Sequence, residues 1–118
     1  MINLEKELAG SFILEESGQD IWIFRLEPKP EWTYFTGHFP DQAVLPAVAI
    51  IDISHFLISK IQHSERIAKV ENFRIRNPVL PEVRIMVTIQ QESPGSFQIH
   101  WRRAEDPIVV AELNLKMN

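Results

Sequence analysis

The chain has 118 residues, a hydrophobic fraction of 45% and a net charge of −4, which suit one compact domain over residues 1–118 and exclude a disordered or fibrous protein. The longest run without a charged side chain, residues 42–51, is too short for a membrane-spanning helix of about 20 residues, and the basic residues are too dispersed to bind a row of nucleic-acid phosphates. The sequence has no cysteine, which excludes disulfides and thiolate metal sites and fits a cytoplasmic location, as does a charged N-terminal segment where an export signal would be apolar.

The N-terminal part of the chain is predicted to form a β-hairpin. Short apolar runs at residues 11–15 and 21–26 flank a Ser-Gly-Gln-Asp turn at residues 17–20, a composition typical of a hairpin. Residues 21–24 are apolar without alternation, so we expect both faces of this strand to be covered.

One long helix is predicted, from Pro46 to about Gln62. The fixed φ of proline suits the first helical turn, and the apolar residues that follow cover most of the helix circumference. The remaining polar stripe consists of Asp52, His55, Ser59, Gln62 and His63. A helix this apolar needs cover on most of its sides, so we expect a curved sheet to wrap it.

The C-terminal half alternates apolar and polar residues with the period of two that a half-buried strand requires. We predict strands at residues 70–75, 83–89, 97–102 and 109–116, of which the last three form an antiparallel meander. In the last strand, one face is expected to carry Val109, Ala111, Leu113 and Leu115. The expected fold class is therefore α+β, with a curved antiparallel sheet around one long central helix.

The segment between the hairpin and the helix carries the residues best suited to chemistry. Gly37 and the neighbouring prolines hold His38 in a rigid, non-repetitive stretch. Asp52 follows fourteen residues later inside an apolar run, where a carboxyl group tends to keep its proton. A histidine and a carboxyl group can act as an acid–base pair. The unpaired backbone N–H groups at Ala47 and Val48 can polarise a carbonyl oxygen.

Each of these side chains also has a purely structural interpretation. A histidine beside a proline turn is more often a structural residue than a catalyst, and Asp52 belongs to a polar helix stripe that solvent can cover. His55, His63 and His100 are expected to be solvated surface residues. Asp52 and His55 have the spacing of two metal ligands, but the sequence offers no third ligand in a suitable context, so no metal site is predicted.

Three segments of the sequence together resemble a known enzyme family. They are Phe35-Thr36-Gly37-His38-Phe39-Pro40, Val44-Leu45-Pro46 with an acid at position 52, and Val70-Glu71-Asn72-Phe73-Arg74-Ile75-Arg76-Asn77-Pro78-Val79-Leu80-Pro81. This pattern, which spans residues 20–116, is similar to that of the β-hydroxyacyl-(acyl carrier protein) dehydratases of fatty-acid synthesis. The resemblance implies a hotdog fold, in which a sheet wraps one long helix, and it agrees with the architecture predicted from periodicity.

The resemblance also implies a site and a reaction. The catalytic histidine of the family falls on His38 and its catalytic acid on Asp52, contributed by opposite subunits of a homodimer or a larger oligomer. The thioester carbonyl is bound by the first backbone N–H of the helix, and the substrate-binding residues are Gly37, Phe39, Pro46, Ala47 and Val48. The implied reaction converts a 3-hydroxyacyl-(acyl carrier protein) thioester to the trans-2-enoyl thioester without a cofactor or metal.

The sequence departs from the family pattern at several positions around this site. Asp41 and Ala47 stand where the family usually has glycine, and Phe56 stands where it usually has glutamine. These changes predict an altered substrate shape and leave reduced activity open. The aspartate at position 52 resembles the branch that also isomerises the product double bond. Short members of this type resemble dehydratases of aryl polyene gene clusters, which use a dedicated carrier protein.

Two other functions fit the same residues. One is an acyl thioesterase on the same fold, in which water attacks the carbonyl. The other is a non-catalytic acyl-binding or partner-binding subunit, in which His38 and Asp52 are relics. Arg74 and Arg76, on the polar face of their predicted strand, are candidate contacts for the acidic carrier protein, with ordinary surface solubility as the alternative role.

Overall fold

The structure, a computed structural model, describes residues 2–36, 43–63 and 66–118. Its elements are a short helix α1 (Leu4–Glu7), strands β1 (Phe12–Ser17) and β2 (Ile21–Leu26), a 3-10 helix η1 (Thr33–Phe35), the long helix α2 (Ala47–Ser59), and strands β3 (Ile67–Ile75), β4 (Ile85–Ser93), β5 (Ser96–Arg103) and β6 (Val109–Met117). Every predicted strand and the long helix are confirmed, whereas α1 and η1 were not predicted.

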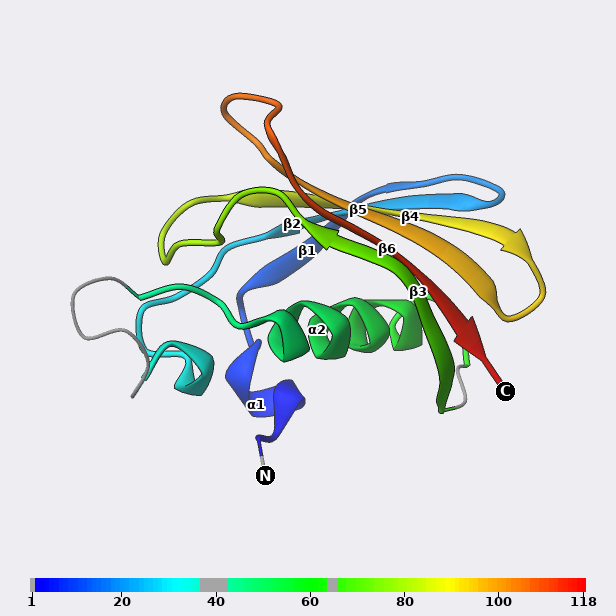
Figure 1. The fold of residues 1–118 in the computed structure, drawn as a ribbon, viewed down its shortest axis with the longest axis horizontal. Helices are drawn as coiled ribbons and strands as arrows, with labels where there is room; N and C mark the ends of the chain where they lie inside the picture. The colour runs from blue at the N-terminus through cyan, green and yellow to red at the C-terminus, as the bar shows by residue number, and fades with distance from the viewer. Residues whose placement is uncertain (1, 37–42, 64–65) are drawn as a thin grey trace.

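The strands form one antiparallel sheet in the order β1-β2-β4-β5-β6-β3. The predicted hairpin is the β1–β2 pair, and the predicted meander is the run from β4 to β6. The sheet curves over α2, which lies along its concave face, and α1 lies on the other side of α2 from the sheet (Figure 1). This arrangement confirms the α+β fold class and leaves β1 and β3 as the two edges.

The core lies between α2 and the sheet. Residues at alternate positions of β4 and β5 are fully or almost fully buried, as the predicted period of two requires: Ile85, Val87, Ile89, Phe97, Ile99 and Trp101. On α2, the buried side chains are Ala49, Ile50, Ile53, Ser54, Phe56, Leu57 and Ile58. The predicted polar stripe of α2 is the less buried side of the helix, where Asp52 and His55 are half-buried.

The bounds of α2 follow from its flanking residues. Pro46 is the N-cap, with extended backbone angles of φ −71° and ψ 159°, so the helix begins one residue later than predicted. The helix ends at Ser59, three residues earlier than predicted, and the chain continues as a hydrogen-bonded turn from Leu57 and Ile58 to Gln62. No helix in the described part of the chain is both long and apolar enough to cross a membrane.

Two predicted burial patterns are confirmed only in part. In β6, Ala111, Leu113 and Leu115 are buried as predicted, and a β-bulge explains why Val109 is not. Ala111 pairs with Trp101 and Val109 pairs with Arg102, so Val110 is an extra residue between these two pairs. Val110 is fully buried, whereas Val109 is exposed. An extra residue reverses which side chains face the core. In β2, Ile21 is 42% exposed, so a single chain does not cover both faces along the whole of this strand.

A second bulge lies in the edge strand β3. Asn72 has a left-handed φ of 53°, and the register shifts by one residue between the pairs of Glu71 with Asn114 and Arg74 with Glu112. The simple alternation predicted for residues 70–75 is therefore interrupted, and Ile75 is 46% exposed.

Candidate active site

Asp52 lies in the middle of α2, on the less buried stripe of the helix. It is half-buried, and its neighbours along the chain, Ile51 and Ile53, are apolar. The Oδ2 atom of Asp52 accepts a hydrogen bond of 3.1 Å from the phenol of Tyr34. The acid identified from the sequence therefore has a partner that comes from outside its own helix.

Tyr34 belongs to η1 and is buried, with 7% of its surface exposed. Burial raises the pKa of this phenol, and the nearby carboxylate of Asp52 raises it further. The phenol therefore keeps its proton throughout the physiological range and acts as a hydrogen-bond donor to the acid. Nothing in the spacing of the sequence linked these two residues, so the sequence prediction of the site missed Tyr34.

The 3-10 helix η1 is held in place by the N-terminal helix. The carboxylate of Glu7, in α1, accepts hydrogen bonds from the backbone N–H and from the hydroxyl of Thr33, the latter at 3.2 Å. An acidic side chain at the start of a helical turn satisfies N–H groups that have no partner within the turn. The rings of Trp32, which precedes η1, and Phe35, which ends it, stack on each other with centroids 6.0 Å apart. Contacts from α1 and from the aromatic stack thus fix the position of η1.

The start of α2 is where the sequence resemblance places the carbonyl-binding site. The backbone N–H of Leu45 donates to the carbonyl of Val79 at 3.0 Å, which ties the segment before the helix to the segment after β3. Ala47 and Val48 are exposed, and Val48 has 57% of its surface exposed. The first N–H groups of an α-helix have no acceptor within the helix, so they are available to a ligand.

The other part of the expected site lies outside the described residues. This applies to His38, the predicted base, to the predicted substrate contacts Gly37 and Phe39, and to Asp41. Among the described residues, no group of three or more His, Cys, Asp or Glu side chains is arranged to hold a metal ion.

Phe56, which departs from the family pattern four residues after Asp52, is a core residue. It is 8% exposed and meets Phe12 of β1 edge to face, with ring centroids 5.4 Å apart. The ammonium of Lys60 lies 4.8 Å from the centroid of its ring. The position that carries a polar residue in the family is thus filled by hydrophobic packing, and Asp52 has no polar neighbour there.

The two candidate carrier contacts differ in their surroundings. Arg76 is paired with Glu112 of β6, with its Nη2 and Nε atoms 2.7 Å and 3.2 Å from the same carboxylate oxygen. The hydrogen bond from Arg76 lowers the pKa of Glu112. Arg74 is exposed and lies opposite Glu112 in the β3–β6 register. Arg74 therefore presents more of its charge to a partner than Arg76 does.

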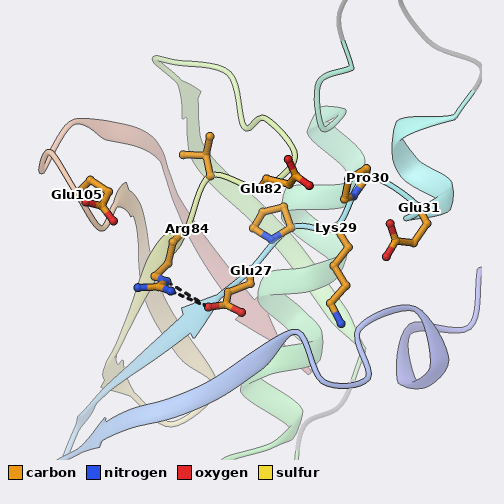
Figure 2. Close-up of a pocket in the computed structure, with 9 residues that line it drawn as sticks. Glu27, Lys29, Pro30, Glu31, Glu82, Arg84 and Glu105 are labelled. Carbon is orange, nitrogen blue, oxygen red and sulfur yellow. Dashed lines mark hydrogen bonds and ion pairs between the residues drawn. The ribbon is translucent and has the colours of Figure 1, made fainter.

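A surface pocket of about 620 Å³ lies where the chain leaves β2 and enters β4. Figure 2 shows its charged lining, with Glu27 and Arg84 joined by an ion pair of 3.1 Å and with Lys29, Glu31 and Glu82 around the opening. Asp52 and the first turn of α2 are not among its lining residues. Among the described residues, the pocket therefore shares none with the candidate active site.

Comparison with known proteins identifies the family. A family model described as ApeI-like, ApeI dehydratase, matches residues 14–112. The chain belongs to the ApeI-like dehydratase family. The match includes Tyr34, the predicted base His38, Asp52 and the helix start.

A curated relative of this ApeI-like chain is the 3-hydroxyacyl-(acyl-carrier-protein) dehydratase FabZ of Agrobacterium fabrum. The two are 27% identical over 92 residues, which cover 70% of this chain and 60% of the FabZ protein. The ApeI-like chain thus aligns with less than two thirds of the length of that relative.

Solved structures confirm the hotdog fold of the ApeI-like chain. The dehydratase heterocomplex ApeI:P from Xenorhabdus doucetiae superposes with a TM-score of 0.78 at 20% identity, covering 89% of this chain and 93% of that one. Thioesterase superfamily member 2 from Mus musculus superposes with a TM-score of 0.74 at 10% identity, covering 95% and 85%. Because a dehydratase and a thioesterase share this fold, the fold alone does not select the reaction.

Proposed function

We propose that this ApeI-like protein dehydrates 3-hydroxyacyl thioesters of an acyl carrier protein to trans-2-enoyl thioesters, in fatty-acid or polyene-type lipid synthesis. The observation that carries the proposal is the half-buried carboxyl group of Asp52, held by a buried phenol, within a chain whose residues 14–112 match a dehydratase family. The proposed location is the cytoplasm, which is consistent with a carrier-protein substrate and with a sequence that has no cysteine.

In the proposed mechanism, His38 removes the proton on the carbon next to the thioester carbonyl. The backbone N–H of Ala47 stabilises the negative charge that develops on the carbonyl oxygen. Asp52 gives its proton to the β-hydroxyl, the carbon–oxygen bond breaks, and the electron pair of the broken carbon–hydrogen bond forms the double bond as water leaves. One acid and one base thus eliminate one water without a metal or an oxidant.

We further propose that the protein is a homodimer in which His38 of one chain faces Asp52 of its partner. The nine-residue strand β3 is an edge of the sheet, and Val70 and Ile75 on it are exposed, which supports pairing with a second copy. Val48, exposed at the start of α2, is a second apolar residue that a partner would cover. The ApeI:P neighbour is a heterocomplex, so a related but different hotdog chain is the alternative partner.

A single assay tests the proposed reaction against the thioesterase alternative. Purified protein is given 3-hydroxyacyl and trans-2-enoyl thioesters, and the absorbance of the conjugated enoyl group and the release of free thiol are followed together. A dehydratase changes the enoyl absorbance and releases no thiol. Thiol release would instead identify a thioesterase, and the absence of both reactions would favour a binding subunit.

Mixed dimers test whether two chains share each site. His38→Ala and Asp52→Asn variants are each expected to be nearly inactive, yet their mixture should recover about a quarter of wild-type activity, since half of randomly mixed dimers are heterodimers with one intact site of two. The two variants are unfolded and refolded together, or coexpressed, to allow exchange. No recovery, with dimers formed normally, would place both groups in one chain.

A further inference from the structure

We propose that Tyr34 is a positioning residue that holds the carboxyl group of Asp52 in the orientation needed to protonate the substrate hydroxyl. This inference rests on the proposed function of Asp52 as the catalytic acid. It goes beyond that function because it assigns a role to a side chain that the His-Phe-Pro motif and the acid do not include.

The contact between Tyr34 and Asp52 joins two elements that are distant in sequence. Tyr34 and Asp52 are 18 residues apart in sequence, on η1 and on the middle of α2, and their oxygen atoms are 3.1 Å apart. The phenol contacts Oδ2 of Asp52. A carboxyl group held through one oxygen presents its other oxygen in a fixed direction, so Oδ1 is the atom left to face the substrate.

The helix position one turn after Asp52 offers the acid no polar partner. On the helix, the residue one turn later is Phe56, which packs against Phe12 and offers no polar group to the acid. A carboxyl group on a half-buried helix side without a fixed partner samples several rotamers, and a misplaced catalytic group costs rate. Tyr34 supplies a polar partner from another segment of the chain.

Tyr34 is itself immobilised, which a positioning role requires. The turn that carries it is anchored by Glu7 through two hydrogen bonds to Thr33, and Tyr34 is only 7% exposed. A buried side chain on an anchored turn loses little further freedom when it holds a neighbour. Because burial keeps the phenol protonated, it stays a donor and stabilises the carboxylate that remains after Asp52 has given up its proton.

The first experiment compares Tyr34→Phe with wild type in the enoyl hydration and hydroxyacyl dehydration assays. The substitution removes one oxygen atom and keeps the ring. We expect kcat to fall about 10- to 100-fold, the range for a residue that orients a reacting group, while KM changes by less than about two-fold. Unfolding midpoints measured in parallel report on the fold.

The matched control is Ser54→Ala, which removes a buried hydrogen bond from the same helix, between Ser54 and Trp101, without touching Asp52. It should lower stability and leave kcat within about two-fold of wild type. A loss of kcat in Ser54→Ala equal to that in Tyr34→Phe would mean that any loosening of α2 has this effect, and the positioning role would be overturned.

A double-mutant cycle separates this inference from the proposed function. In the Asp52→Asn background, Tyr34→Phe is expected to cause no further loss, since Tyr34 acts through Asp52. If wild type shows no hydration or dehydration, or Asp52→Asn retains full activity, the proposed function fails. If wild type is active and Asp52→Asn is slow, two outcomes would show that only the role of Tyr34 is wrong. One is a wild-type kcat in Tyr34→Phe, and the other is a Tyr34→Phe substitution that slows the Asp52→Asn variant by the same factor as it slows wild type.

A spectroscopic measurement keeps the inference testable even where Tyr34→Phe fails to fold. Tyr34 is the chain's single tyrosine, so protein grown with 3-fluorotyrosine gives one ¹⁹F resonance from this residue alone. We expect this resonance to shift in Asp52→Asn and to stay in place in Ser54→Ala. An unshifted resonance in a folded Asp52→Asn variant would show that the phenol does not contact the acid.

Discussion

The indole nitrogen of Trp101 on β5 donates a hydrogen bond of 3.0 Å to the hydroxyl oxygen of Ser54 on α2, and both side chains are completely buried. This contact joins the central helix to the middle of the sheet across the core. It lies two residues from Asp52 along the helix, on the opposite side from the candidate site. The contact therefore helps to set how α2 sits against the sheet without entering the chemistry.

Replacing Ser54 with alanine is expected to lower the free energy of unfolding by about 1–3 kcal/mol, because the indole N–H of Trp101 would be left buried without an acceptor. Denaturation in urea measures the change. Ser17→Ala, at the exposed end of β1, is the matched control and should change the same quantity by less than about 0.5 kcal/mol. An unchanged stability of the Ser54→Ala variant would contradict the role of this hydrogen bond.

Replacing Asp52 with asparagine is expected to reduce turnover by about two to four orders of magnitude, the usual contribution of one acid–base group. Asparagine keeps the shape of the side chain and can still accept a hydrogen bond from Tyr34, but it has no proton to give. Steady-state dehydration and hydration rates measure the loss, and a normal unfolding midpoint checks that the variant folds. Wild-type rates in this variant would remove Asp52 from the mechanism.

The long helix and the strands could be predicted from the sequence because their signals are local. Alternation in β4 and β5 follows from which side chains face α2, and the predicted positions agree with the buried ones from Ile85 to Trp101. Alternation fails where a bulge adds a residue, as at Val110, because register depends on the partner strand. Helix α1 has only four residues and no apolar stripe, so no periodic pattern reveals it.

The candidate site was only partly predictable for a related reason. Asp52 is conspicuous because it interrupts an apolar helix, and the motif around His38 draws attention by its glycine and prolines. Tyr34 has no such signal, since its importance comes from a contact between two segments that only the folded chain brings together. The same is true of Glu7, which reaches Thr33 across 26 positions of sequence.

Reversing the charge of Arg74 is expected to weaken binding of the proposed partner, an acidic carrier protein, about ten-fold and to reduce the salt dependence of binding, because exposed charges act mainly through long-range attraction. Arg76→Glu should have a similar or smaller effect, since Arg76 already pairs with Glu112. Lys69→Glu, on the same strand, is the control for a general change in net charge. Titration calorimetry at low and high salt gives the dissociation constants. Binding that is insensitive to salt and to reversal of both arginines would identify these residues as ordinary surface charges.

The ionisation of Tyr34 gives a pH prediction that does not depend on activity. Burial and the carboxylate of Asp52 raise the pKa of the phenol in the folded chain above that of an unfolded tyrosine, which is about 10. The folded chain thus holds a proton that the unfolded chain releases. This contribution to stability is complete below about pH 10 and is lost as pH rises from there towards the folded pKa.

Two measurements check this prediction. The tyrosinate absorption band should be absent from the native protein at about pH 10.5 and should appear when guanidinium unfolds it, because the chain has one tyrosine and a free phenol is mostly ionised at that pH. The free energy of unfolding should fall more steeply above about pH 10 in wild type than in Tyr34→Phe, which corrects for the lysines that titrate in the same range. In Asp52→Asn the band should appear at lower pH than in wild type, since the carboxylate no longer opposes a negative phenolate. A native protein whose tyrosine ionises like the free amino acid would show that Tyr34 is neither buried nor beside the acid.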